Sequence, residues 1–160
     1  MAAAGTITVT DTVPGRDGRD TLREIERVKF ADISLAFDTD GGAGKAYRLY
    51  ETVFNRTPDP GGLGFHMNSL DVGASLATVA NSFVTSAEFL AGGIPTNEQF
   101  VSQLYFYGLN RAPDEGGFAF HIGSLASGAS RGDVVVAFSE SPENQAAVIG
   151  VIQNGMVYTG

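Results

Sequence analysis

The chain has 160 residues, the size of one compact domain with room for a buried core. Its apolar content of 43% excludes an extended disordered chain, and no apolar run approaches the ~20 residues that a membrane-spanning helix needs. The net charge of −8 argues against nucleic acid as a partner, because binding to a phosphate backbone depends on clustered lysine and arginine.

The location of the protein is left open by its composition. The sequence has no cysteine, so it carries no disulfide that would report the redox compartment. No Sec-type signal peptide is visible, because the N-terminus lacks a basic segment followed by an apolar stretch. This favours the cytoplasm, but an acidic, glycine-rich chain with two lysines also suits a protein that is exported unfolded and folds outside with calcium.

Residues 1–40 carry the pattern of a small β region. Thr6–Val13 alternates polar and apolar residues, which is typical of a half-buried strand. The glycines and aspartates of Gly15–Asp20 predict a turn or loop. Ile25–Phe37 contains two short alternating runs on either side of Ala31, so we expect a hairpin there. A sheet of about three strands is marginal alone and must cover its apolar face.

Residues 41–160 change to a helical period, which makes the fold class α+β and mainly α. A first helix is predicted over 44–54. Further helices are predicted over 60–70, 76–90, 97–109, 115–126 and 131–153, the last with a break. Residues in N-cap positions support these helix starts; they are Ser75, Thr96, Ser130 and Ser141.

An internal repeat organises the helical part. Residues 46–89 align without a gap with residues 101–144, with 19 identities in 44 positions. Within it, "NRTPDPGGLGFH" returns as "NRAPDEGGFAFH". Each unit of about 55 residues predicts a helix, a sharp corner, a second helix, a Gly-Ala-Ser turn and a third helix. We expect the two tandem units to bury their apolar faces against each other in one bundle.

The repeated corner has a structural interpretation. Its proline ends the incoming helix, and the following aspartate lies at the N-cap of the next helix, where it also meets the helix dipole. The arginine three residues earlier is expected to bond this aspartate, and the glycine pair permits a bend or a close helix approach. The corner residues are Arg56, Asp59 and Gly62 in the first copy and Arg111, Asp114 and Gly117 in the second.

A functional interpretation of the same corner is a paired metal site. His66 and His121, together with the two corner aspartates, would suit a transition metal if the fold brought both copies together. However, the histidines follow Phe65 and Phe120 on a stripe that we expect to face the core. A hydrogen-bonded packing role is therefore the favoured interpretation of both histidines.

Two acidic stretches make calcium a candidate ligand. Asp38 and Asp40 open a loop with the Asp-x-Asp-Gly pattern of an oxygen-ligand site, although Leu49 stands where an EF-hand has its closing glutamate. Asp17 and Asp20 lie in a stretch that resembles one degenerate turn of the calcium-binding nonapeptide of RTX proteins. One turn alone cannot close a site that is built between stacked turns, and plain Asp-Gly loops remain the alternative.

Residues 15–158 resemble a bacterial domain of unknown function that accompanies hemolysin-type (RTX) calcium-binding repeats in large secreted and cell-surface proteins. The doubled Arg-x-Pro-Asp-x-x-Gly motif carries the resemblance, and the corner is also distantly similar to phycobilisome linker domains. The resemblance implies a mostly helical, secreted or surface-attached module, often near the C-terminus of a type I secretion substrate, and no established reaction. That family commonly has an aromatic pair where this chain has Phe65-His66 and Phe120-His121.

Three functions follow as hypotheses. The first is a non-catalytic extracellular calcium-binding module that serves adhesion, matrix or surface-layer assembly. The second is glycan binding at an aromatic and acidic groove, because Tyr105, Phe106 and Tyr107 cannot all face one core. The candidates for this ligand surface are Tyr105, Tyr107, His66 and His121. The third, an enzyme, has no catalytic motif in its favour.

The expected partners are a surface polysaccharide or another matrix protein. The repeat is compatible with packing within one chain and with exchange between chains, so an oligomer stays open. A helical scaffold that binds no calcium is a further alternative to the first hypothesis.

Overall fold

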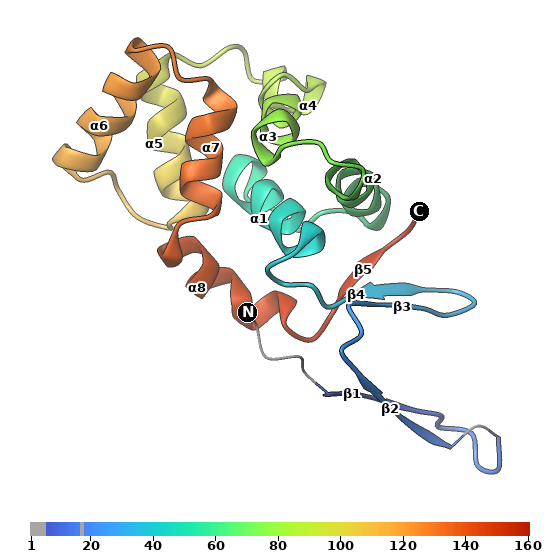
Figure 1. The fold of residues 1–160 in the computed structure, drawn as a ribbon. Helices are drawn as coiled ribbons and strands as arrows, with labels where there is room; N and C mark the ends of the chain where they lie inside the picture. The colour runs from blue at the N-terminus through green and yellow to red at the C-terminus, as the bar shows by residue number, and fades with distance from the viewer. Residues whose placement is uncertain (1–5, 17) are drawn as a thin grey trace.

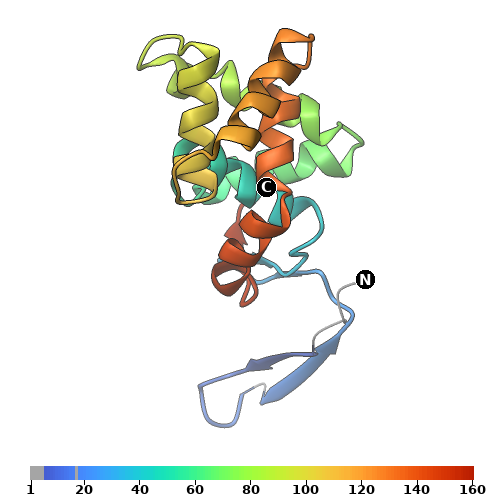
Figure 2. The same cartoon turned by 90° about the vertical axis from the view of Figure 1, so that its left-hand side faces the viewer.

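The computed structural model describes residues 6–16 and 18–160 and confirms a mainly α fold with small β elements. Figures 1 and 2 show a helical bundle joined to the β elements, of which one hairpin projects away from the helices. The strands are β1 (Thr6–Thr10), β2 (Arg19–Arg23), β3 (Arg27–Lys29), β4 (Ser34–Ala36) and β5 (Met156–Tyr158). The helices are α1 (Gly42–Phe54), α2 (Pro60–Asp71), α3 (Leu76–Val84), α4 (Ala87–Leu90), α5 (Asn97–Gly108), α6 (Glu115–Ala126), α7 (Arg131–Ser139) and α8 (Pro142–Ile152).

The strands form two antiparallel sheets, where the sequence predicted one. β1 pairs with β2 alone, and the second sheet has the order β3-β4-β5. The predicted hairpin over Ile25–Phe37 is confirmed as β3 and β4. The loop predicted over Gly15–Asp20 ends too late, because β2 already begins at Arg19, which lies opposite Thr10 of β1. The third strand of the second sheet comes from the C-terminal residues, where the sequence predicted no strand.

β5 joins the β region to the first helices. Ala36 of β4 lies opposite Met156 of β5, and the N–H group of Thr159 donates to the carbonyl oxygen of Pro60 at 2.9 Å. The carbonyl group of Thr159 lies so close to Gly64 of α2 that a Cβ atom there would overlap it. β5 therefore crosses the boundary that the sequence placed between the β region and the helical domain.

Replacing Gly64 with alanine is expected to lower the free energy of unfolding by about 1–3 kcal/mol, because β5 or α2 must shift to admit the methyl group. Gly123→Ala on α6 is the control. A Cβ atom at Gly123 meets open space, so this variant should gain about 0.5–1 kcal/mol from helix propensity. Urea unfolding followed by circular dichroism measures both. Equal stability of the two variants would contradict the contact between β5 and α2.

The helix starts agree with the sequence prediction. At each predicted cap a side-chain hydroxyl accepts a hydrogen bond from the backbone N–H three residues on, as at Ser75, Thr96, Ser130 and Ser141. The break expected within 131–153 separates α7 from α8. A second break, which was not predicted, separates α3 from α4, because Ser86 caps a new helix.

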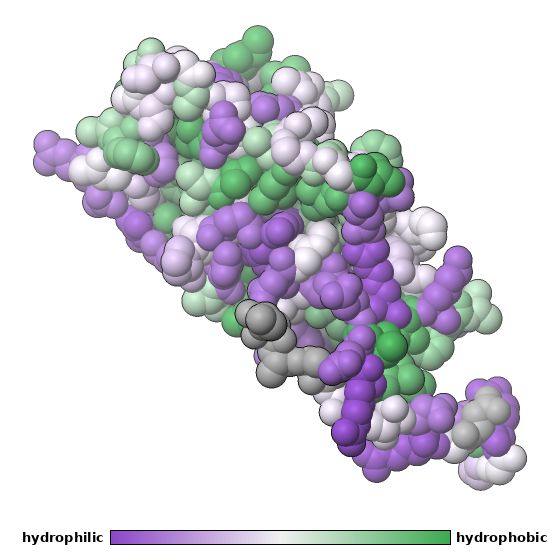
Figure 3. Space-filling view, viewed as in Figure 1, coloured by the Kyte–Doolittle hydropathy of each residue, from purple (hydrophilic) through white to green (hydrophobic). Residues whose placement is uncertain are grey.

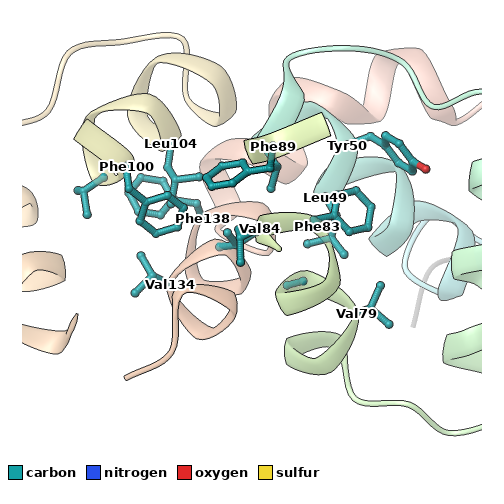
Figure 4. Packing of buried hydrophobic residues seen from close by; sticks show 14 of the residues in the cluster. Leu49, Tyr50, Val79, Phe83, Val84, Phe89, Phe100, Leu104, Val134 and Phe138 are labelled. Carbon is teal, nitrogen blue, oxygen red and sulfur yellow. The ribbon is translucent and has the colours of Figure 1, made fainter. Parts of the chain in front are cut away.

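The two repeat units, α1–α4 and α5–α8, pack together around one core. α3 and α7 cross where the equivalent positions Ala77 and Gly132 meet, and a Cβ atom on Gly132 would lie 2.7 Å from the carbonyl oxygen of Ala77. Figure 4 shows the core side chains of both units facing one another, with Leu49 and Phe83 from the first and Phe138 from the second. The expected burial of the two apolar faces is confirmed.

A second, smaller core covers one face of the first unit. It joins residues of α1 and α2 to residues of α8, β4 and β5. Its members include Ala43, Tyr47, Leu63, Met67, Val148, Ile152, Ala36 and Met156. Among the residues that the structure describes, the second unit has no equivalent apolar cover.

The surface differs between the two parts of the molecule. Figure 3 shows apolar patches over the helices on this face, whereas hydrophilic residues predominate on the β1–β2 hairpin. Over residues 6–16 and 18–160, none of the helices combines the length and the apolar content that crossing a bilayer requires.

Candidate functional site

The two corners have the same backbone geometry. Asn55 directly follows α1 and Asn110 lies two residues after the end of α5, with φ of +52° and +50°, a left-handed conformation that asparagine tolerates better than most residues. The aspartate of each corner then accepts a hydrogen bond of 2.8 Å from the backbone N–H three residues on. The predicted N-caps at Asp59 and Asp114 are therefore confirmed.

The corner glycines admit a tyrosine hydroxyl from the preceding helix. A Cβ atom at Gly62 would overlap the hydroxyl of Tyr50, and one at Gly117 would overlap that of Tyr105. Burial raises the pKa of both tyrosines. Because Tyr105 is only 3% exposed, it belongs to the corner and not to the ligand surface that the sequence suggested.

Each corner arginine pairs with a glutamate far along the chain. Arg56 donates to both carboxylate oxygens of Glu88 at 2.8 and 2.9 Å, and Arg111 does the same to Glu143 at 2.8 and 3.1 Å. These hydrogen bonds lower the pKa of each glutamate. Arg111 also reaches Asp114 at 3.2 Å, so the predicted bond from arginine to aspartate is confirmed in the second corner and wrong in the first.

The two imidazoles lie in separate aromatic sites. The ring centroid of His66 is 4.4 Å from that of Phe83, and the His121 ring is 4.5 Å from Phe138. Burial lowers the pKa of both histidines, against a smaller opposite effect of the corner aspartates. α2 and α6 lie on opposite sides of the bundle (Figures 1 and 2), so the paired metal site is not assembled. Among the residues that the structure describes, no three metal-ligating side chains converge.

The expected core-facing stripe is wrong at the phenylalanines that precede the histidines. Phe65 and Phe120 are 67% and 68% exposed. On α2 the buried face is occupied by Leu63 and Met67, and a residue two positions along a helix lies about 200° around its axis. The phenylalanine between them therefore faces solvent.

The calcium candidates lie apart. The side chain of Asp38 is 5% exposed; its Oδ2 atom accepts from the N–H of Ala43 at 3.1 Å and from Arg27 at 3.3 Å. Arg27 also pairs with Asp71, and its hydrogen bonds lower the pKa of that carboxyl. Asp40 is exposed in the turn before α1.

The remaining two candidates are on the projecting hairpin. Asp20 is exposed on β2, opposite Val9 of β1, so it lies in a strand and not in the predicted loop. Asp17 lies outside the residues that the structure describes.

A hollow of about 580 Å³ runs along α5 and is open to solvent. It contains the aromatic rings of Phe106 and Tyr107, whose side chains are exposed, with residue exposures of 54% and 37%. The prediction that part of the Tyr-Phe-Tyr run stays on the surface is therefore confirmed. The lining residues are Glu98, Gln99, Ser102, Gln103, Phe106 and Tyr107.

The polar groups of the hollow are held in place by backbone contacts. The Oε1 atom of Gln99 accepts from the N–H of Thr96 at 2.8 Å, and the Nε2 atom of Gln103 donates to the carbonyl of Val53 at 3.2 Å. Hydrogen bonds from its own backbone N–H and from the Thr96 hydroxyl lower the pKa of Glu98. The hollow thus offers an ionised carboxylate and two oriented amides.

The hollow exists because α4 is short. In the first unit the equivalent face of α1 is covered by Val148 and Ile152 of α8. α4, the counterpart of α8, stops at Leu90, and Gly93 with φ of +91° turns the chain away. The face of α5 therefore stays open. In the sequence, the alignment of the two units ends at 89 and 144, so the difference between α4 and α8 could have been inferred from it.

The fold and the site define a helical domain built from two repeat units. The family described as "Domain of unknown function (DUF4214)" matches residues 46–92 and 80–148, so the chain belongs to this family. Searches of curated proteins and of solved structures found no match.

Proposed function

We propose that this chain is a non-catalytic binding module for a neutral polysaccharide, with the hollow on α5 as its binding site. The observation that supports this most directly is the combination of two exposed aromatic rings with polar side chains that the backbone holds in place. This is the glycan-binding alternative that the sequence raised, with Tyr107 retained as a ligand residue.

The chemistry of the lining suits a sugar. The apolar face of a pyranose packs on an aromatic ring, while amides, a carboxylate and a hydroxyl bond its hydroxyl groups. The hollow is shallow and open along α5, so a short stretch of oligosaccharide can lie along it. The net charge of −8 disfavours an anionic polymer, so a neutral one is proposed.

The lining favours binding over hydrolysis. Glu98 is the one carboxylate among the lining residues, and enzymes that cleave glycosidic bonds ordinarily use two. A module with a single carboxylate and two aromatic rings is better suited to holding a sugar chain.

The proposed setting is a secreted or cell-surface protein that is exported without a Sec signal peptide and takes part in adhesion or matrix assembly. Its support is the resemblance to the domain that accompanies RTX repeats. A polysaccharide partner fits this location, because such polymers surround bacterial cells.

Binding to immobilised β-1,4-glucan, xylan and mannan tests the proposed function. Tyr107→Ala is expected to weaken binding to the recognised polymer about tenfold, which corresponds to about 1.4 kcal/mol. Ile94→Ala is the control, since Ile94 is 79% exposed but does not line the hollow. Failure of the parent chain to bind any of the three polymers, or undiminished binding by Tyr107→Ala, would contradict the proposal.

Calcium at Asp38 and Asp40 remains a second candidate. One observation favours it: the Oδ1 atom of Asp38 is buried and has no hydrogen-bond partner among the described residues. Such an oxygen is a ready cation ligand. The contact of Arg27 with the other oxygen of the same carboxylate works against it, because the guanidinium already supplies a positive charge there.

Thermal unfolding in EDTA and in millimolar calcium, with magnesium as control, tests this candidate. A bound ion stabilises the folded state by about 2.7 kcal/mol at a hundred times its dissociation constant. If calcium binds, the midpoint rises with calcium alone, and Asp40→Ala removes the rise. Asp40 is the better position to change because it is exposed, whereas Asp38 also bonds the start of α1. An unchanged midpoint would exclude the site.

A further inference from the structure

The exposed phenylalanines occur at equivalent positions of the two units. Phe65 on α2 and Phe120 on α6 have nearly the same exposed fractions, 67% and 68%. A core position is repeated because the fold needs it twice, but a ring in solvent contributes little to the fold. Its occurrence in both units therefore points to a role at the surface.

Each exposed ring stands against an imidazole. The centroids of Phe65 and His66 are 5.1 Å apart at an interplanar angle of 81°, and those of Phe120 and His121 are 5.2 Å apart at 78°. Both imidazoles are fixed from behind by the core phenylalanines described above. The ring and the imidazole therefore form a preorganised pair in each unit.

The imidazole nitrogens are open to an incoming ligand. Over residues 6–16 and 18–160, no protein group is hydrogen-bonded to His66 or His121, and their nitrogens are not among the buried polar atoms that lack a partner, so they reach solvent. One neutral imidazole offers both a donor and an acceptor to an incoming hydroxyl group.

The neighbours on the same helix leave each ring accessible. One turn before the phenylalanine stands a glycine in both units, Gly61 and Gly116, and three residues after it stand Asn68 and Gly123. No large side chain from these positions covers the ring.

We propose that Phe65 with His66 and Phe120 with His121 form two matched sugar-binding sites in addition to the hollow on α5. In each, a pyranose lies on the phenylalanine ring and a sugar hydroxyl bonds the imidazole. The class of ligand rests on the proposed function. With the hollow on α5, the two matched sites give the chain three binding sites for the sugar.

The surroundings favour a sugar over a protein partner. A protein interface has an apolar centre ringed by further contacts, whereas the helix neighbours one turn before and after each of these rings are small or polar. The lowered pKa of both histidines keeps them uncharged at neutral pH, which suits a neutral ligand.

The two histidines are the only ones in the chain, so their imidazole C–H signals in NMR spectra report the two sites separately. The probes are cellohexaose, xylohexaose and mannohexaose. With the hexasaccharide that binds, both signals are expected to shift. Phe65→Ala should abolish the ligand-induced shift of His66 and leave that of His121, and Phe120→Ala should do the reverse.

Two conservative variants test whether binding needs an aromatic ring or only an apolar side chain at position 65. Phe65→Tyr should retain the ligand-induced shift, whereas Phe65→Leu should lose it. All four variants are at an exposed position, so we expect them to remain folded, which unchanged amide spectra would verify.

The outcomes distinguish this inference from the proposed function. If a hexasaccharide binds and Tyr107→Ala weakens it, but neither histidine signal moves, the matched sites are refuted and the hollow stands. If no hexasaccharide binds, both proposals fail. Self-association of the parent chain that Phe65→Ala abolishes would identify a protein interface instead and contradict the inference.

Discussion

Replacing Glu140 with alanine is expected to lower the free energy of unfolding by about 3–5 kcal/mol. Arg48, which is 3% exposed, donates to both carboxylate oxygens of Glu140 at 2.8 and 2.6 Å and to the carbonyl of Thr39 at 2.7 Å. A guanidinium group stays protonated at all ordinary pH values. Without Glu140, its charge would remain buried between α1 and α7 with no other carboxylate in contact among the residues that the structure describes.

Glu88→Ala is the matched control. Glu88 accepts the same two hydrogen bonds from Arg56, but the two side chains are 37% and 48% exposed. Water replaces a lost partner at such a site, so we expect a loss of less than about 1 kcal/mol. Urea unfolding of both variants compares them directly. Losses of equal size would show that burial of Arg48 is not what makes the first pair matter.

Phe100→Ala is expected to destabilise the protein by about 3–5 kcal/mol, because it leaves a cavity in the main core. Phe100 is fully buried. Its ring meets that of Phe89 edge to face at a centroid distance of 6.1 Å, and the Arg131 guanidinium lies 4.9 Å from its centroid. The change therefore removes contacts that join the two units.

Phe106→Ala, six residues further along α5, removes the same kind of ring from a solvent-exposed position. Phe106 is 54% exposed, and its loss should change the free energy of unfolding by about 0.5 kcal/mol or less. The same variant should weaken polysaccharide binding. A stable Phe106→Ala variant that binds like the parent chain would show that this ring takes no part in the site.

The corners could be predicted from the sequence because their chemistry is local. Asp59 and Asp114 bond groups three residues away, and proline excludes the helical conformation of its predecessor. The pairing of Arg56 with Glu88 could not be derived in this way, since it spans 32 residues and depends on how α4 packs. The matched glutamates of the two units were the available signal.

The sequence predicted that the candidate site would contain exposed aromatic residues, but it did not predict where the hollow would lie. The aromatic run of α5 indicated that some rings must stay outside, and burial selects Phe106 and Tyr107 while Tyr105 turns inward. The hollow itself depends on α4 stopping at Leu90, a difference in length between the units whose signal in the sequence is the end of the alignment at 89 and 144. The outward position of Phe65 was predictable, because Leu63 and Met67 already define the buried face of α2.

The β elements show the limit of local patterns. β5 has three residues and gains its order from pairing with β4, more than a hundred residues earlier in the chain. A strand this short has no recognisable period of its own. Its position against Gly64 depends on tertiary packing. The glycine at position 64 was the one indication in the sequence that another segment approaches α2 closely there.

Binding of a neutral sugar chain to the hollow on α5 can be followed by backbone amide NMR spectra of the ¹⁵N-labelled chain, titrated with cellohexaose, xylohexaose and mannohexaose. We predict concentration-dependent shifts for amides between Glu98 and Tyr107 with at least one of the three, and none for the buried equivalent face of α1. Spectra in which the amides of α5 stay unchanged with all three would contradict binding at the hollow.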